Sequence, residues 1–122
     1  MIKVGIGKNN NQDATIAARE ASKEALERLG ATADLILLFS SIIYDQNKVS
    51  EGVRSVAPSV PIAGGTAGWG TITSQGLGEK EVTVAALKFG RVKVGVSYVS
   101  DLAKDSFKAG QLLAENIISS SM

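Results

Sequence analysis

The chain has 122 residues, of which 44% are apolar, and its 13 basic and 12 acidic side chains give a formal net charge of +1. These values fit one folded domain. Cysteine and histidine are both absent, which excludes disulfides, cysteine nucleophiles, and serine–histidine or histidine–zinc chemistry within the chain.

Charge and hydropathy exclude two further classes of partner. No block of five basic residues occurs, so the chain lacks the cluster with which proteins neutralise nucleic-acid phosphates. The longest apolar run, 35–39, falls far short of the roughly 20 residues that span a bilayer. We therefore expect a cytoplasmic protein with no metal, no cofactor, no nucleic acid and no membrane partner.

The chain begins with a strand signal and a helix signal. A β-branched run at 2–7 ends in glycine and predicts a buried strand. Alanine and leucine then recur at helical spacing, which predicts a helix over 14–29. Asn11 or Asp13 would cap its amino end, and Gly30 lies where a left-handed carboxyl cap is expected.

The strand–helix alternation continues through the middle of the chain. The continuous apolar run at 34–41 predicts a strand covered on both faces. A second helix is expected over 45–57 with Asp45 as its cap, and a third strand over 60–65. The order β-α-β-α-β predicts parallel strands joined by right-handed crossovers.

The pattern changes in the last third. Three strand candidates, 69–74, 80–89 and 92–99, are separated by gaps of turn length, and residues 90–91 resemble a hairpin connection. A closing helix is expected over 100–121. The predicted fold class is therefore α/β, a single domain over 1–122 in which one mixed sheet gains antiparallel strands and a carboxyl-terminal helix.

A ligand site is expected where the first three strands end, because parallel α/β sheets bind ligands outside the carboxyl ends of their strands. Backbone amides and a lysine there suit a carboxylate or phosphate, whereas a carboxylate with hydroxyls suits an ammonium group. The candidate ligand-binding residues are Gly7, Lys8, Ser40, Ser41, Tyr44, Asp45, Gly64, Gly65, Thr66 and Trp69.

Each candidate also has a structural interpretation. Glycines after a strand usually serve turn geometry, and Asp45 would cap its helix whether or not it binds a ligand. Trp69 is as readily a core residue, Lys8 a solvated lysine, and Ser40 with Ser41 the end of a strand.

Two catalytic or nucleotide motifs almost match. The stretch GIGKNN begins as a dinucleotide fingerprint, but Asn10 stands where the third glycine belongs. The Gly65–Thr66 bond resembles the cleavage site of self-processing hydrolases with an amino-terminal threonine nucleophile. The residues before Thr66 are predicted to form strands and helices of the domain itself, which disfavours that cleavage.

The order of these features resembles the N-terminal part of the FIST domain, over roughly residues 2–118. The stretches that carry the resemblance most strongly are 34–45 and 60–76, with the small-residue motif Pro61–Gly68 and the aromatic–acidic pair Tyr44 and Asp45. One departure is Gly65, where relatives often have cysteine. A second is length, because typical members continue further, so this chain resembles a truncated or minimal version.

The resemblance implies a sensory module that binds a small polar ligand, with an amino acid as the leading class, and acts in signal transduction. It implies no catalytic residue, so we expect no enzyme activity. A signalling protein and a second copy of the chain are the candidate partners. Two alternatives stay open: a structural or oligomerising domain, and a small-molecule enzyme that works without cysteine or histidine.

Overall fold

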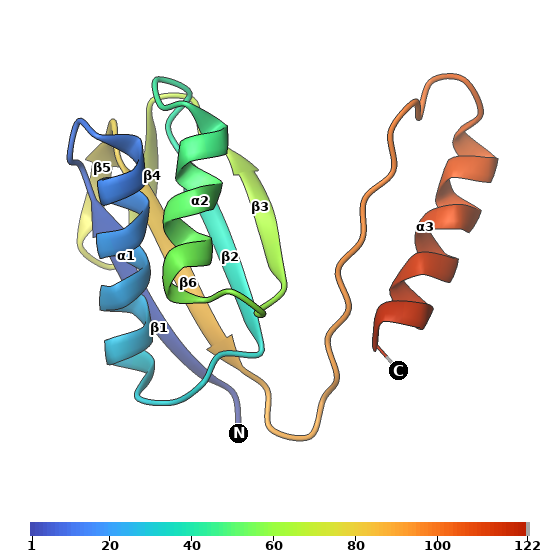
Figure 1. Cartoon of the computed structure of the whole chain (residues 1–122), viewed down its shortest axis with the longest axis horizontal. Helices are drawn as coiled ribbons and strands as arrows, with labels where there is room; N and C mark the ends of the chain where they lie inside the picture. Colours follow the sequence, from blue (N-terminus) through green and yellow to red (C-terminus); the bar gives the residue numbers. More distant parts are fainter. Residues whose placement is uncertain (122) are drawn as a thin grey trace. The chain divides into compact units, whose positions relative to one another are not determined.

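The computed structural model describes residues 1–121 and divides the chain into two units (Figure 1), Met1–Gly90 and the segment that starts at Arg91. The first unit contains eight elements: β1 Lys3–Asn9, α1 Ala14–Leu29, β2 Leu35–Ser40, α2 Gln46–Val56, β3 Ile62–Thr66, β4 Gly70–Thr73, β5 Gly76–Glu79 and β6 Val82–Lys88. The second contains α3 Ser106–Ser121.

A four-stranded mixed sheet in the order β1-β6-β2-β3 forms the centre of the first unit. β2 and β3 are parallel, whereas β6 is antiparallel to both of its neighbours, β1 and β2. β1 and β2 therefore run in the same direction although β6 separates them. The predicted α/β class and mixed sheet are confirmed.

Helices α1 and α2 lie side by side over one face of this sheet (Figure 1). Successive side chains of β6 point to opposite faces of the sheet. Val82, Val84 and Ala86 point to the covered face and are buried beneath the helices. The helix α1 contributes only small side chains to most of this contact, which lets its backbone lie close to β1. Its fully buried alanines are Ala17, Ala18, Ala21 and Ala25.

The helix α1 has the bounds and caps that the sequence predicts. The Asp13 carboxylate accepts a hydrogen bond from the Ile16 amide, which satisfies one of the free amides of the first turn. Gly30 closes the helix in the left-handed conformation, with φ of 68°.

The predicted strand at 92–99 and its hairpin at 90–91 are wrong, because residues 92–99 have no regular structure. β6 explains the error: it is hydrogen-bonded to β1 along one edge and to β2 along the other. No edge of β6 remains for the next segment to pair with in a hairpin. The closing helix also begins later than expected, at Ser106.

The glycine-rich stretch after β3 forms a small separate sheet. β4 pairs with β5 in an antiparallel hairpin, in which Gly70 lies opposite Glu79 and Thr73 lies opposite Gly76. A hydrogen bond of 2.7 Å between the hydroxyls of Thr71 and Thr83 joins this hairpin to β6. Between residues 1 and 121, no helix combines the length and apolarity needed to cross a membrane.

Candidate functional site

The ends of β1, β2 and β3 meet at one edge of the sheet. The strand registers place Asn9 beside Val82, Val82 beside Ser40, and Ser40 beside Thr66. This row crosses all four strands, so the three loops that follow β1, β2 and β3 leave the sheet at the same edge. The loops carry most of the residues that the sequence predicts for a ligand site.

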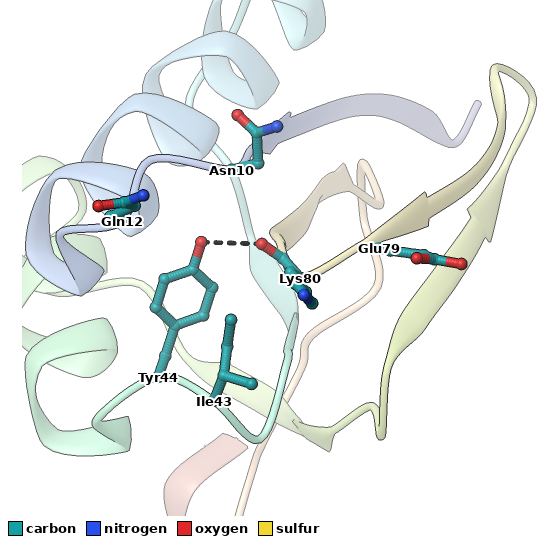
Figure 2. Close-up of a pocket in the computed structure, with 6 residues that line it drawn as sticks. All are labelled: Asn10, Gln12, Ile43, Tyr44, Glu79 and Lys80. Atoms are coloured by element: carbon teal, nitrogen blue, oxygen red, sulfur yellow. Dashed lines mark hydrogen bonds between the residues drawn. The ribbon is translucent and has the colours of Figure 1, made fainter.

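A pocket with a volume of about 510 Å³ lies at this edge. Figure 2 shows its lining, which comes from the loop after β1, the loop after β2 and the end of the β4–β5 hairpin. We call it the Tyr44 pocket. Its lining residues are Asn10, Gln12, Ile43, Tyr44, Glu79 and Lys80.

Tyr44 holds the walls of this pocket together. Its side chain is 7% exposed, and its hydroxyl lies 2.7 Å from the carbonyl oxygen of Asn11. The hydroxyl also lies 3.0 Å from the carbonyl oxygen of Lys80 (Figure 2). A neutral phenol has one hydrogen to donate, so the two carbonyls compete for it. Burial, and then the negative charge of Glu81, raise the pKa of Tyr44, which keeps the phenol in its donor form.

Lys80, which the sequence analysis missed, organises the turn between β5 and β6. Its backbone has a positive φ of 51°, which is uncommon for a residue other than glycine. Its amide donates to the carbonyl of Trp69 at 2.8 Å, and its ammonium lies 5.5 Å from the centre of the Trp69 ring. Trp69 is 62% exposed, so it is not a core residue, and its ring face binds this cation.

A smaller pocket, of about 290 Å³, lies along the outer strand β3, and we call it the β3-edge pocket. Ser40 lines it and donates a hydrogen bond to the side-chain oxygen of Gln46. The predicted residues are thus divided: Tyr44 lines the larger pocket, and four others line the smaller one, namely Ser40, Gly64, Gly65 and Thr66.

Two of the predicted glycines are explained by close packing. A Cβ atom at Gly7 would overlap the carbonyl oxygen of Ala21 in α1 and lie 2.6 Å from the amide nitrogen of Ala25. A Cβ atom at Gly64 would overlap the carbonyl oxygen of Leu38 in the neighbouring strand. Gly7 therefore lets α1 approach β1, and Gly64 lets β3 approach β2.

The remaining predicted residues line neither pocket. The buried Ser41 hydroxyl donates to the Gly68 carbonyl at 3.3 Å and accepts from the Ile43 amide, which links the loops after β2 and β3. Lys8 is half-buried on β1, opposite Thr83. Among residues 1–121, no three acidic side chains are grouped as a metal ion would require.

Asp45 caps α2, as the sequence predicts. One oxygen of its carboxylate accepts hydrogen bonds from the amides of Asn47 at 3.0 Å and Lys48 at 3.4 Å. The cap uses only this one oxygen, so ammonium binding by Asp45 stays a prediction.

We expect Asp45→Ala to lower the free energy of unfolding by about 1 kcal/mol, the usual cost of losing a helix cap. Chemical denaturation would measure it. Asp13→Ala, which removes the equivalent cap of α1, is the matched comparison and should cost a similar amount. A much larger loss at Asp45 alone would assign its carboxylate a second structural contact.

Glu81 is a second residue that the sequence analysis missed. It lies between the β5–β6 turn and β6, it is 8% exposed, and its Oε1 atom has no hydrogen-bond partner in the described part of the chain. No sequence pattern distinguishes it from the neighbouring solvated residues Glu79 and Lys80, because its burial depends on the hairpin folding over it.

The comparisons with known proteins give one family and a distant structural likeness. No curated protein matches the chain. A mutant form of FtsZ and an empty FtsZ dimer, both from M. jannaschii, are 22% identical to it, with TM-scores of 0.48 and 0.47. The matches cover 79% and 76% of this chain, which spans only 30% and 28% of those chains.

The FIST N domain family matches residues 34–121, from the start of β2 to the end of α3. This match covers well over half of the chain, and it includes the Tyr44 pocket apart from Asn10 and Gln12. The chain therefore belongs to the FIST N domain family, a family of sensory domains.

Proposed function

We propose that this domain senses a small polar molecule, an amino acid or a similar compound, which binds in the Tyr44 pocket. The family is sensory rather than enzymatic, which supports a binding role. The observation that carries the proposal is the Tyr44 hydroxyl, which two backbone carbonyls share. A ligand that hydrogen-bonds to either carbonyl would commit the hydroxyl to the other.

This competition supplies a means of signalling. Asn11 belongs to the loop before α1, and Lys80 belongs to the turn before β6. A ligand that changes which carbonyl the phenol contacts would therefore change how tightly two separate segments are held. The resulting shift in conformation is what a signalling partner would detect.

Size and composition favour the Tyr44 pocket over the β3-edge pocket. Small-molecule sites are usually clefts of roughly 300–1,000 Å³ with a few polar groups, and about 510 Å³ lies well within that range. The pocket also contains a side chain with a shifted pKa, which is a feature of binding and catalytic sites.

We expect a ligand of this pocket to raise the melting temperature of the protein. At a concentration of a hundred times its dissociation constant, a ligand adds about 2.7 kcal/mol of stability, which corresponds to a shift of several degrees. Thermal unfolding would be followed with amino acids, small carboxylates and nucleotides, each added separately.

Two variants would locate the site. Asn10→Ala removes an exposed side chain that lines the Tyr44 pocket, and it should abolish the shift. Thr66→Val changes the β3-edge pocket instead and should leave the shift intact. The reverse pattern would move the site to the β3 edge, and an unchanged melting temperature with every compound would contradict the proposed function.

A further inference from the structure

The carboxylate of Glu81 is buried without a partner for one of its oxygens. The β4–β5 hairpin covers it, and a Cβ atom at Gly78 of β5 would overlap Oε1. The glycine at position 78 therefore leaves the space that the carboxylate occupies. The backbone of Glu81 is fixed as well, because its carbonyl accepts a hydrogen bond from the Ser41 amide at 3.1 Å.

The neighbouring donors are engaged elsewhere. The Thr83 hydroxyl, two residues along the chain, shares a hydrogen bond of 2.7 Å with the Thr71 hydroxyl, in which either oxygen can be the donor. It makes no hydrogen bond to Oε1 of Glu81. The ammonium of Lys80 lies over the Trp69 ring. In the described part of the chain, no salt bridge joins Glu81 to a basic side chain.

A buried carboxylate in this state is costly. The unpaired buried atom is Oε1, and native proteins leave few buried polar atoms in that state. Folding alone does not explain why a glutamate occupies this position. A cationic group from outside the chain would supply the missing hydrogen bonds and the missing charge.

We propose that Glu81 is the anionic anchor for the ammonium group of a small ligand that enters through the Tyr44 pocket. The inference rests on the proposed function and specifies its ligand class, a compound with a primary amine. Other pocket groups fit the same chemistry: the carbonyls of Asn11 and Lys80 compete for one phenol hydrogen, so an N–H donor from a ligand could satisfy the carbonyl that lacks it.

The β5–β6 turn provides the route from the pocket to Glu81. Lys80 lines the pocket and immediately precedes Glu81, which lies just behind that lining. The turn is held by one Tyr44 hydrogen bond and includes the positive φ of Lys80. The Lys80 amide bond to the Trp69 carbonyl and the Ser41 amide bond to the Glu81 carbonyl also hold this turn. A ligand that takes over the Lys80 carbonyl would therefore remove one of these three hydrogen bonds and loosen the turn.

Burial makes Glu81 a stronger candidate than Asp45 for binding an ammonium group. One oxygen of the Asp45 carboxylate already accepts two amide hydrogen bonds at the start of α2, and its side chain is exposed. Glu81 is buried, where an ion pair with a ligand is screened less by water and salt.

The test compares matched compounds that differ in an amine. L-alanine is paired with propionate, and ethanolamine with ethylene glycol, and each compound is titrated while the melting temperature is followed. We expect the amines to stabilise the wild-type protein and their amine-free counterparts to have little effect. Glu81→Gln should weaken amine binding about tenfold or more, because it removes a charged hydrogen bond. Glu51→Gln, on the exposed face of α2, is the charge-matched control and should bind normally.

The outcomes separate the two proposals. Equal stabilisation by amines and by their amine-free counterparts would overturn the role of Glu81 and leave the Tyr44 pocket as a ligand site. No stabilisation by these probes or by the wider panel above would contradict both. A clearly lower melting temperature for unliganded Glu81→Gln would also overturn the inference, since it would show that the folded protein already stabilises the charge.

Discussion

Replacing Gly7 by valine is expected to destabilise the protein by about 3 kcal/mol, the upper part of the usual range for overpacking a core. The first added carbon would overlap the Ala21 carbonyl oxygen. The obstacle is helix backbone rather than a flexible side chain, so α1 would have to move as a body away from β1. Valine favours β-strands by less than about 1 kcal/mol, which is too little to compensate.

Thermal and chemical unfolding would measure this loss, which corresponds to roughly 10 °C in melting temperature for a domain of this size. Gly65→Ala is the matched control, because a Cβ atom there would meet nothing within 4 Å and its backbone needs no positive φ. We expect Gly65→Ala to change stability by less than about 1 kcal/mol. A similar loss in both variants would refute the packing explanation for Gly7.

The same two glycines show what the sequence could predict. Both follow the expected pattern of small residues near strand ends, and the sequence analysis assigned both to a ligand site. The structure distinguishes them by what lies opposite: helix backbone at Gly7 and open space at Gly65. That distinction depends on how α1 docks against β1, which local sequence does not encode.

Local signals predicted the first three strands and both helices of the first unit well. Capping residues, helical spacing and apolar runs act within one element, so Asp13, Gly30 and Asp45 could be assigned from their neighbours alone. The sequence also predicted that the three loops share one edge of the sheet, since strands that run in the same direction end on the same side.

The position of β6 could not be predicted in the same way. Its sequence fits a strand in any position, and the two-residue gap after it suggested a hairpin with 92–99. β6 instead lies between β1 and β2, two strands that precede it in the chain. Pairing between distant segments decides the sheet order, and it also decides which residues the hairpin covers. For this reason the sequence analysis did not identify Lys80 and Glu81 as candidate site residues, whereas it did identify Tyr44.

Tyr44→Phe should lower the free energy of unfolding by about 1–2 kcal/mol at neutral pH, the cost of leaving a partly buried hydrogen-bond partner unpaired. The phenyl ring keeps the apolar contacts of the side chain, so the loss would report the hydroxyl bonds to the Asn11 and Lys80 carbonyls. Tyr98→Phe, at a side chain that is 87% exposed, is the control and should be neutral.

The stability difference between wild type and Tyr44→Phe should also depend on pH. The folded state raises the pKa of Tyr44 above its ordinary value of 10.0, so the folded protein holds the phenol proton more tightly than the unfolded chain does. The resulting stabilisation is complete below about pH 10 and is lost as the pH rises through the raised pKa. Urea unfolding of both proteins between about pH 8 and about pH 11 would test this, because lysine deprotonation affects them alike. A difference that stays constant across that range would mean that Tyr44 titrates equally in both states, contrary to its burial beside Glu81.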